Sequence, residues 1–319
     1  MSTIGDIAKK TGFSSMTVSR YFNDPERVKP ATRAIIRRAV EELNYSPNSV
    51  AKSLAKKCTS IIYVYIAPDL EVLHPFVQLS VAALGERLGE YGYSFLLSRK
   101  MYTDESCDGV IAIGMTLSQE NVMSHFEKKP LVIFGNNKEA ANWVDVDNYR
   151  GSHDMTRFLL NKGCKRIAYI GVSQDKRYGF ERFSAYRDCL IENGARFDES
   201  VVRMCDNKES AGYKSTKSLL EAGQLPEAIE CASDLLAIGC IRALNEASVS
   251  VPEQVMVTGF DGLGYEMIAH PHITTVHQPI YEVGLKLADM MVGILRGNAP
   301  SKGVYVVPEI VEHGSTRKN

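Results

Sequence analysis

The sequence lacks the features that several large classes of protein require. It contains no CxxC pair, and its seven cysteines are an odd number, so neither a zinc site nor a disulfide framework is indicated. We expect reduced thiols in a cytoplasmic protein. The longest strongly apolar run, Ile61–Ala67, is far shorter than the roughly 20 residues of a membrane-spanning helix. The first ten residues show no basic region followed by an apolar segment, so no signal peptide is predicted.

Motifs of the common enzyme classes are also missing. The sequence has no Walker phosphate loop, no GxSxG turn and no HExxH metal motif. Gly262 and Gly264 form a GxG pair without the third glycine of a dinucleotide-binding loop. The histidines are scattered, which is typical of surface or core positions: His74, His270, His272 and His277. The sequence therefore predicts neither an enzyme nor a cofactor or metal site.

The charge is close to balanced overall and unevenly distributed. The formal net charge of the 319 residues is −1. Residues 1–57 contain eleven Lys and Arg against five Asp and Glu, a net of +6, which leaves −7 for the remainder. A basic N-terminal segment on an acidic body is typical of a nucleic-acid-binding module joined to another domain, although a solvated helix face would give a similar excess.

Three short helices are predicted within the first 46 residues. Thr3 can cap the first, Gly12 ends it, and Ser14 caps a second helix that Asn23-Asp24-Pro25 ends. Pro30 begins a third helix with apolar residues at helical spacing. Two helices joined by a tight glycine-containing turn and followed by a packing helix are typical of a helix-turn-helix, so an all-α head is expected.

The head resembles the lactose-repressor (LacI/GalR) family at many fixed spacings. The matching segments are Thr3–Ala8, Gly12-Phe13-Ser14, Thr17–Asn23, Thr32-Arg33, Leu43-Asn44-Tyr45 and Pro47–Leu54. The resemblance implies that Ser15, Met16 and Arg20 face the major groove, where Arg20 can bond guanine and Met16 can contact a thymine methyl. It also implies that Thr17, Ser19 and Asn23 meet phosphates. A surface arginine paired with an acid is the alternative for Arg20.

Residues 48–55 resemble the family's hinge helix. The resemblance implies that Leu54 enters the minor groove and kinks the duplex, with Asn48 and Lys52 also contacting DNA. Lys52 replaces the family's usual Arg, so phosphate contact is retained without bidentate geometry. A core position in the next domain is the alternative for Leu54, and the basic and polar residues around it disfavour that interpretation.

From Ile61 onward, short apolar strands alternate with helical stretches. This order predicts α/β lobes with parallel sheets. The expected strands are Ile61–Ile66, Ser94–Leu97, Val110–Ile113, Leu131–Phe134, Ile167–Ile170, Ala228–Cys231 and Val255–Gly259. The expected helices are Phe76–Tyr91, Ser152–Lys162, Arg182–Asn193, Gly212–Ala222, Leu235–Ala247 and Tyr281–Leu295.

The family resemblance continues through this body, for example in Val146-Asp147-Asn148, Ser233–Gly239, Gly259-Phe260-Asp261 and Pro271–Val276. It implies two lobes of the periplasmic sugar-binding type, joined by crossing strands, with a ligand between them. The domain boundaries expected are 1–46 for the head, 47–59 for the hinge and linker, and 60–319 for the body. Within the body we expect an N-terminal lobe of about 60–147 and 278–305, and a C-terminal lobe of about 148–277 and 306–319.

Candidate ligand-binding residues follow from strand ends and from the resemblance. Asp234 and Asp261 follow strands, Arg182 begins a helix, and Asp147 lies near the lobe crossover. An arginine flanked by carboxylates suits neighbouring hydroxyls, so a sugar or sugar-like polyol is favoured over a purine. Phe76 and Tyr178 complete the predicted set. Core packing for Phe76 and a helix N-cap role for Asp234 remain alternatives.

Four departures from the family pattern limit this transfer of roles. Ser233 replaces the usual Asn, Ala185 replaces the usual Gly, and Asn207 stands where some members have an aromatic residue. Only Met101–Asp108 connect two expected strands where the family has a helix, which predicts an under-covered sheet face in the N-terminal lobe that a partner or the dimer mate covers.

The sequence as a whole predicts a DNA-binding transcription regulator, most simply a repressor, that a small molecule controls allosterically. A homodimer would place two heads on a pseudo-palindromic operator. The tail after Val311 contains no leucine heptads, so tetramers through it are not expected. A ligand-binding protein of the periplasmic type, without DNA regulation, is the alternative, and the predicted head and the absent signal peptide disfavour it.

Overall fold

The computed structural model describes residues 3–45, 58–100, 106–116, 119, 129–137, 142–173, 176–223, 225–298 and 303–317. The chain divides into two compact units, Met1–Thr59 and Ser60–Asn319. We call the first unit the head and the second the body. Among the described helices, none has the length and apolar character that crossing a membrane requires.

The head is a small helical unit whose ends are set by local chemistry. Its elements are α1 (Ile4–Thr11), α2 (Ser15–Asn23), the single turn η1 (Pro25–Arg27) and α3 (Pro30–Glu42). Thr3 and Asp6 form a capping box at the start of α1, and Gly12 ends that helix with a φ of 73°. One side chain from each helix closes the core, namely Ile7, Val18 and Ile36, all fully buried. The predicted helix-turn-helix is confirmed.

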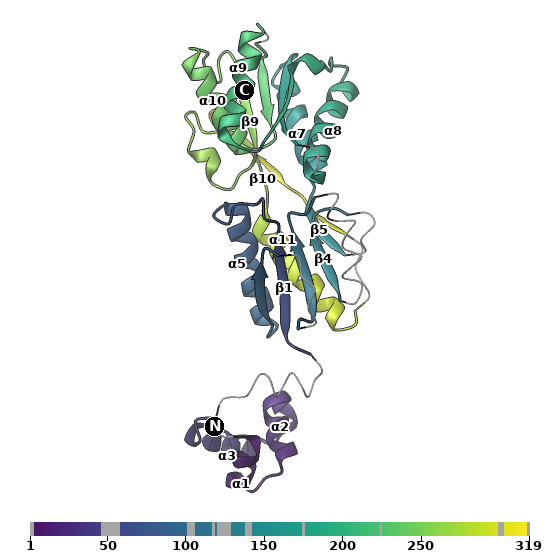
Figure 1. Ribbon diagram of the computed structural model, residues 1–319, viewed down its shortest axis with the longest axis vertical. Coiled ribbons are helices and arrows are strands. Elements are labelled where there is room, and N and C mark those ends of the chain that lie inside the picture. Colours follow the sequence, from purple (N-terminus) through teal and green to yellow (C-terminus); the bar gives the residue numbers. More distant parts are fainter. Residues whose placement is uncertain are drawn as a thin grey trace. The chain divides into compact units, whose positions relative to one another are not determined.

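The N-terminal lobe of the body is a six-stranded parallel sheet. In sheet order its strands are β11 (Val304–Val306), β5 (Trp143–Val146), β4 (Leu131–Phe134), β3 (Gly109–Ile113), β1 (Ile61–Ile66) and β2 (Ser94–Ser98). Helices α5 (Pro75–Glu90) and α11 (Ile280–Leu295) pack together on one face, where β1 contributes Ile62 and Val64 to the core (Figure 1). The central strands are apolar on both faces, as expected of parallel strands covered on both sides.

The C-terminal lobe repeats this plan. In sheet order its strands are β12 (Glu309–Val311), β10 (Thr274–His277), β9 (Met256–Asp261), β8 (Ala228–Cys231), β6 (Ile167–Val172) and β7 (Val202–Cys205). Only β12 runs antiparallel to its neighbour. Helices α7 (Asn148–Asn161) and α8 (Arg177–Glu192) cover one face, and α9 (Glu209–Glu221) and α10 (Asp234–Glu246) cover the other (Figure 1). Short turns η3 (Glu199–Val201) and η4 (Tyr265–Met267) join these elements.

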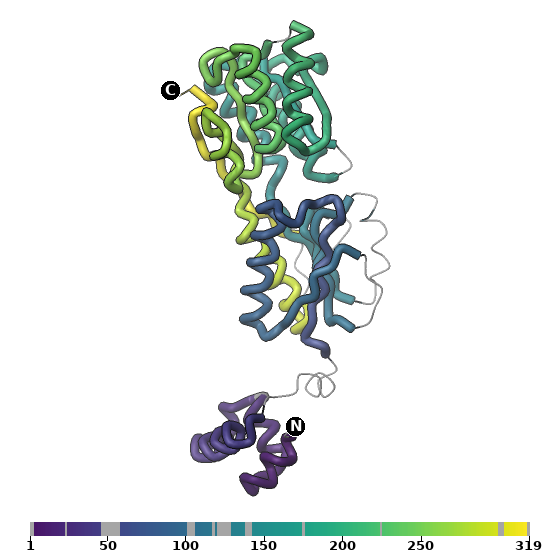
Figure 2. The backbone as a smooth tube through the Cα atoms, turned by 60° about the vertical axis from the view of Figure 1, so that its left-hand side comes forward, coloured from purple at the N-terminus to yellow at the C-terminus, as the bar shows by residue number. Residues whose placement is uncertain are grey.

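The chain crosses between the lobes three times: from β5 to α7, from β10 to α11, and from β11 to β12 (Figure 2). The lobes are therefore joined by adjacent strand connections rather than by one linker. This confirms the expected class of two parallel-sheet lobes behind a helix-turn-helix head.

All seven strands expected from the sequence are present, whereas β5, β7, β10, β11 and β12 were not foreseen. Each missed strand has three or four residues and includes polar or charged side chains, such as Asp145 in β5 and Arg203 in β7. Runs this short give no recognisable period, and neighbouring strands supply the hydrogen bonds that define them.

The short connection between β2 and β3 is anchored at the end that follows β2. Arg99 Nη2 donates to the carbonyl oxygen of Leu70 at 2.7 Å, and the Tyr63 hydroxyl donates to the carbonyl oxygen of Lys100 at 2.7 Å. The prediction of an under-covered face is wrong for the interior strands, and exposure on this face lies at the two edge strands, where Leu96 of β2 is 53% and Tyr305 of β11 is 42% exposed. The interior positions of that face are buried: Tyr63, Tyr65, Val110, Ala112, Ile133 and Trp143.

The core of the C-terminal lobe contains one polar layer. Glu230 of β8 is 3% exposed, and the hydroxyls of Ser152 and Thr156 from α7 contact its two carboxyl oxygens at 2.6 Å. Among the described residues, no cationic side chain forms an ion pair with Glu230. Burial therefore raises the pKa of this carboxyl from 4.5 to about 7, and the two hydroxyl hydrogen bonds oppose the rise.

Glu230→Gln should stabilise the protein increasingly as pH rises above about 4.5. Because the native pKa lies above the unfolded value, native Glu230 binds more protons between about pH 4.5 and 7, so its contribution to stability falls as pH rises through that window. The variant lacks this loss, so its free energy of unfolding should exceed that of the wild type by up to about 3 kcal/mol at pH 8 and should equal it at pH 4. Urea unfolding at both pH values measures this, with the exposed Glu221→Gln as control. Equal differences at the two pH values would contradict it.

Candidate nucleic-acid interface and ligand site

Helix α2 presents its outer face to solvent because its inner face closes the core of the head. Ser14 caps the helix by accepting from Thr17 N at 3.2 Å, and Val18 is fully buried against α1 and α3. On the opposite side Ser15 and Arg20 are exposed, and Met16 is 71% exposed. The outer face of α2 therefore offers one apolar and two polar side chains to solvent.

The remaining predicted DNA contacts are less fully described. Thr17 and Ser19 are half-buried, and the Thr17 hydroxyl contacts that of Ser14 at 2.9 Å. Among the described residues, no acid forms an ion pair with Arg20, so the paired-arginine alternative has no support. The side chain of Asn23, and Asn48, Lys52 and Leu54 altogether, lie outside the described residues.

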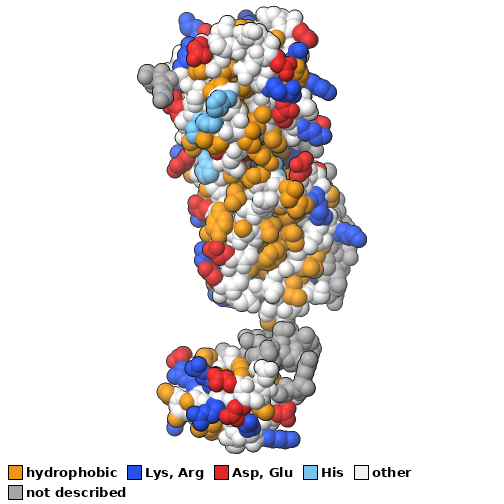
Figure 3. All heavy atoms as spheres, turned by 90° about the vertical axis from the view of Figure 1, so that its left-hand side faces the viewer, with side chains coloured by type: hydrophobic (Ala, Val, Ile, Leu, Met, Phe, Trp, Pro, Cys, Tyr) orange, Lys and Arg blue, Asp and Glu red, His pale blue; other side chains and the backbone are white. Residues whose placement is uncertain are grey.

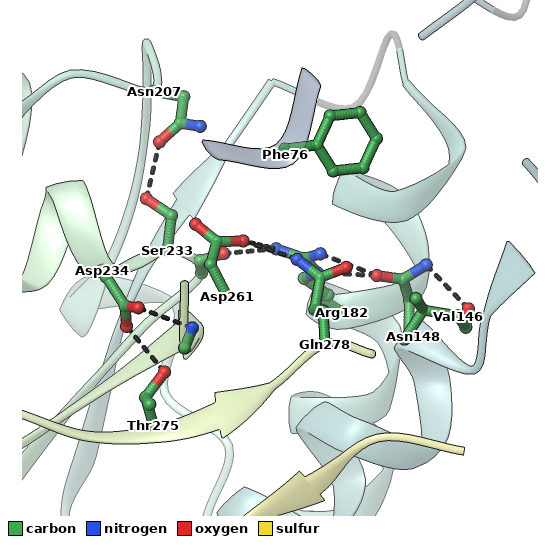
Figure 4. A network of polar contacts seen from close by, with 12 residues as sticks. Phe76, Val146, Asn148, Arg182, Asn207, Ser233, Asp234, Asp261, Thr275 and Gln278 are labelled. Carbon is green, nitrogen blue, oxygen red and sulfur yellow. Dashed lines mark hydrogen bonds and ion pairs between the residues drawn. The ribbon is translucent and has the colours of Figure 1, made fainter. Parts of the chain in front are cut away.

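In the body, the guanidinium of Arg182 forms the centre of a buried polar network (Figure 4). The side chain comes from α8 and is 4% exposed as a residue. Its Nε and Nη2 donate to Asn148 Oδ1 at 2.9 and 2.8 Å, and Nη1 donates to the carbonyl oxygen of Ala232 at 2.7 Å. Nη1 also lies 3.7 Å from Asp261 Oδ1. The guanidinium carbon lies 3.5 Å from the ring centre of Phe260.

Asp261 ends β9 with a φ of 133°, a conformation that L-residues rarely adopt. Its Oδ1 accepts from Gln278 Nε2 at 2.7 Å. Burial raises the pKa of this carboxyl, while the charges of Arg182 and His74 lower it. Asp261 is 7% exposed, so the network retains a carboxylate oxygen close to the surface beside the guanidinium.

Asp234 lies beneath this network. Its Oδ2 accepts from Gly262 N at 2.7 Å, and its Oδ1 accepts from the Thr275 hydroxyl at 2.6 Å. Burial, and then the neighbouring charge of Asp261, raise its pKa well above the usual range. Asp234 is not the N-cap of α10, because Ser233 takes that position and accepts from Leu236 N. The carboxylate instead fixes the turn that follows Asp261.

The other predicted residues surround the network at different depths. Phe76 of α5 faces the polar groups from the N-terminal lobe and lies 5.0 Å from the ring of Phe134 (Figure 4). The Tyr178 ring lies 4.9 Å from the guanidinium of Arg182. Asp147 caps α7 by accepting from the backbone N–H of the third residue of that helix at 3.0 Å. The structure thus brings Arg182, Asp261 and Tyr178 together and gives Asp147 a capping role.

Polar contacts join the two lobes beside this network. The Lys176 ammonium pairs with Asp69 and donates to the carbonyl oxygen of Gly114 at 3.2 Å. Asn136 Nδ2 donates to Glu181 Oε1 at 2.7 Å. Asn136 N donates to Asp145 Oδ2 at 2.8 Å, and burial raises the pKa of Asp145 to about 7. These contacts hold the N-terminal lobe against the start of α8, the helix that contains Arg182.

Sequence reasoning missed two members of the network, Asn148 and Gln278. Both lie at strand ends: Gln278 directly follows β10, and Asn148 begins α7 two residues after the end of β5. Polar side chains at the carboxyl ends of parallel strands are the expected lining of a ligand site. Because β5 and β10 were not recognised as strands, this signal was not available. The Ser233 hydroxyl donates to Asn207 Oδ1 at 2.5 Å, so these two departures from the family pattern form one pair (Figure 4).

Comparison with known proteins agrees with both units. Residues 3–48 match the model of bacterial regulatory proteins of the lacI family, and residues 156–316 match the periplasmic binding protein-like domain. The chain is 31% identical over 319 residues to the uncharacterised HTH-type transcriptional regulator YvdE of Bacillus subtilis, covering 99% of this chain and 100% of that protein. The chain belongs to the LacI family of bacterial regulatory proteins. It is a helix-turn-helix transcription regulator.

Three further comparisons, one with a relative and two with solved structures, agree with this result. The HTH-type transcriptional regulator CelR of Thermobifida fusca is 30% identical, with 92% of each chain covered. A structure of a transcriptional regulator CelR–cellobiose complex aligns with a TM-score of 0.75 and 28% identity over 99% of this chain and all of that one. The lac repressor dimer bound to operator and the anti-inducer ONPF shares the fold, with a TM-score of 0.83 at 24% identity and 99% of each chain covered.

Replacing Asp234 should destabilise this LacI-family body more than replacing Asp147. Asp234→Ala leaves the buried Gly262 N–H and the Thr275 hydroxyl without their acceptor, which costs roughly 2 kcal/mol or more. Asp147→Ala removes one helix cap near the surface, which costs about 1 kcal/mol. Urea denaturation of both variants measures the difference. A free energy of unfolding for Asp234→Ala equal to or above that of Asp147→Ala would show that Asp234 does not fix this turn.

Proposed function

We propose that this regulator is a repressor that binds a pseudo-palindromic operator as a homodimer and is released or retained by a sugar-like effector bound at the Arg182–Asp261 network. The observation that supports effector control is a buried guanidinium and a nearly buried carboxylate at the strand ends of one lobe, facing an aromatic ring of the other. In this proposal the site binds a ligand and performs no chemistry, and no cofactor takes part.

In the head, we assign base reading to the exposed face of α2. Arg20 would donate two hydrogen bonds to guanine, Met16 would contact a thymine methyl, and Ser15 would accept several bases. Thr17, Ser19 and Asn23 would fix the helix on the phosphates without reading sequence. We assign Asn48, Lys52 and Leu54 to a hinge that binds the minor groove.

Arg20→Ala should reduce affinity for the preferred operator about 10- to 100-fold and relax the preference at one base pair of each half-site. Arg37→Ala removes the same charge from α3, where Arg37 pairs with Glu41, and should change affinity much less. Fluorescence anisotropy against a library of palindromic duplexes and their half-sites, at several salt concentrations, measures both. If the two variants lost the same affinity for every duplex sequence, Arg20 would make only a non-specific phosphate contact. Half-sites that bind as tightly as palindromes would contradict a dimeric reader.

In the body, the donor and acceptor set favours hydroxyl-rich effectors. Asp261 can accept from hydroxyls and Arg182 can donate to them, while Phe76 and Tyr178 offer apolar faces to a pyranose ring. Asp147 would act at the edge of the site by capping the start of α7. Asp234 would act from beneath the site by fixing the turn that follows Asp261. The cellobiose complex of CelR makes disaccharides the first class to test.

Asp261→Asn should weaken binding of the effector sugar about 10- to 100-fold while operator affinity without sugar is unchanged, because a hydrogen bond to a charged acceptor is lost. Asp188→Asn, on the same helix as Arg182 but bonded to Tyr149 and Arg187, is the matched control. Calorimetry with a panel of mono- and disaccharides, followed by operator anisotropy with each binder, measures this. An Asp261→Asn protein that keeps a normal sugar response would remove Asp261 from the site.

The homodimer would form through the body. Figure 3 shows apolar side chains gathered in a band over both lobes. The exposed large apolar side chains of the body include Leu73, Leu96, Leu97, Met267 and Ile268. In the proposed mechanism, effector binding changes the relation of the two N-terminal lobes across the dimer, which orders or releases the paired hinges on DNA in the cytoplasm.

A further inference from the structure

Glu230 is an ionisable residue in the apolar core of the C-terminal lobe. In the sheet it lies between Tyr169 of β6 and Thr258 of β9, its register partners on either side. All three residues are buried, and the surrounding core is apolar. An ionised carboxylate in such a place is unfavourable unless it is paired, and no cation of the described residues pairs with it.

Helix α7 connects this carboxyl to Arg182 through one stripe of polar side chains. Asn148, Ser152 and Thr156 follow one another at intervals of four residues, so they lie on one face of the helix. Asn148 binds the guanidinium of Arg182, Ser152 contacts both the Arg182 carbonyl oxygen and Glu230, and Thr156 contacts Glu230. Arg182 is therefore held at its side chain and at its main chain by the helix that also contacts Glu230.

The oxygen–oxygen contacts in this layer need more protons than the hydroxyls supply. Ser152 Oγ lies 2.9 Å from the Arg182 carbonyl oxygen and 2.6 Å from Glu230 Oε1, and Thr156 Oγ1 lies 2.6 Å from Glu230 Oε2. Thr156 Oγ1 also contacts the Ser152 carbonyl oxygen at 3.0 Å, so four contacts of hydrogen-bond length share the protons of two hydroxyls. A protonated Glu230 provides one more proton: its O–H donates to Ser152, whose own proton then reaches the Arg182 carbonyl oxygen.

We propose that Glu230 is a positioning residue for Arg182, acting through Ser152, and that effector binding is thereby linked to the proton on the Glu230 carboxyl. When Glu230 ionises, the Ser152 hydroxyl turns to the carboxylate, and the Arg182 carbonyl oxygen loses that donor and keeps only the backbone N–H of its own helix. The inference rests on the proposed role of Arg182 in holding the effector.

The other titratable groups that face Glu230 stay in one state while it changes. Tyr169 on β6, and Tyr186 and Cys189 on α8, all have pKa values raised by burial, and that of Cys189 rises to about 11. Cys231, the next residue of β8, likewise has a pKa raised by burial. Arg182 contacts this layer through its carbonyl oxygen, which accepts from Ser152. Glu230, with a pKa of about 7, is therefore the group in the layer that titrates near neutral pH.

Effector affinity should then fall as pH rises through the Glu230 pKa. Gain or loss of one hydrogen bond at Arg182 corresponds to a change on the order of three- to tenfold between pH 6 and 8. Asp145, Glu181, Asp234 and Asp261 also have raised pKa values near Arg182 and add their own pH dependence. The quantity to compare is accordingly the difference between the wild type and variants of this layer.

Three variants separate the proton relay from a simple structural role. Glu230→Gln imitates the protonated acid, because its amide can donate to Ser152 and its oxygen can accept from Thr156. Ser152→Ala keeps the carboxyl and breaks the relay. Thr216→Val removes a different fully buried hydroxyl of the same lobe, which donates to the Gly212 carbonyl oxygen, and serves as the control.

The test follows two signals from pH 5.5 to 8.5 on the full-length protein. Infrared difference spectra report the protonated carboxyl, and the ¹⁵N–¹H resonance of Arg182 Nε reports its position. We expect a carboxyl band that titrates in wild type and is absent in Glu230→Gln. In wild type and Thr216→Val, the chemical shift of the Arg182 resonance should change with pH together with the carboxyl band. In Glu230→Gln and Ser152→Ala, the part of that shift that tracks Glu230 ionisation should vanish.

Calorimetry with cellobiose as the probe tests the link to binding. After the pH dependence shared by all variants is subtracted, Glu230→Gln should bind cellobiose as tightly at pH 8 as at pH 6. Ser152→Ala should show, at every pH, the weaker affinity of wild type with Glu230 ionised. If cellobiose fails to bind, the proposed effector class fails for that probe, while the two spectroscopic signals still decide the relay. An Arg182 resonance that titrates identically in Glu230→Gln and wild type would overturn the inference.

Discussion

The body depends on the burial of one guanidinium. Arg182 is nearly inaccessible, and a buried cation is tolerated only when its donors are satisfied. Asn148, the Ala232 carbonyl oxygen and Asp261 accept from it or lie beside it, and the Phe260 ring stacks against it. These partners come from α7, the end of β8 and the end of β9. Satisfying one side chain thus fixes the relative positions of the elements that meet at the strand ends of the C-terminal lobe.

The same arrangement explains how two buried acidic side chains can lie close together at these strand ends. Burial raises the pKa of both Asp234 and Asp261, and only Asp261 faces the arginine. Asp234 is compensated by hydrogen bonds from Gly262 and Thr275 instead. One carboxylate therefore shapes the turn and the other remains next to the guanidinium. A polar ligand that donates to Asp261 and accepts from Arg182 would replace water at groups that are already oriented, which lowers the entropic cost of binding.

The lobe junction provides a physical route from this site to the rest of the molecule. Arg182 lies on the helix whose first turns contact the N-terminal lobe, through Glu181 and through the adjacent Lys176. A ligand that moves the start of α8 must change those contacts. The chain joins the lobes at three adjacent crossings, a connection that is compatible with rotation of one lobe against the other.

The sequence by itself determined the head and the alternation of strands and helices, and it singled out Arg182 and Asp261, which the structure brings together. These signals are local: caps at Thr3 and Ser14, a glycine at position 12, apolar runs of four to six residues, and polar residues directly after recognisable strands. Only the tertiary structure decided which partner each side chain has. Asn148 and Arg182 are 34 residues apart, and Ser152 and Glu230 are 78 apart. No period or spacing specifies such pairs, because they form when helices pack on a sheet whose short edge strands are defined by their neighbours. For the same reason the sequence showed Glu230 as one polar residue in an apolar strand, and the fold made it a buried acid beside two hydroxyls.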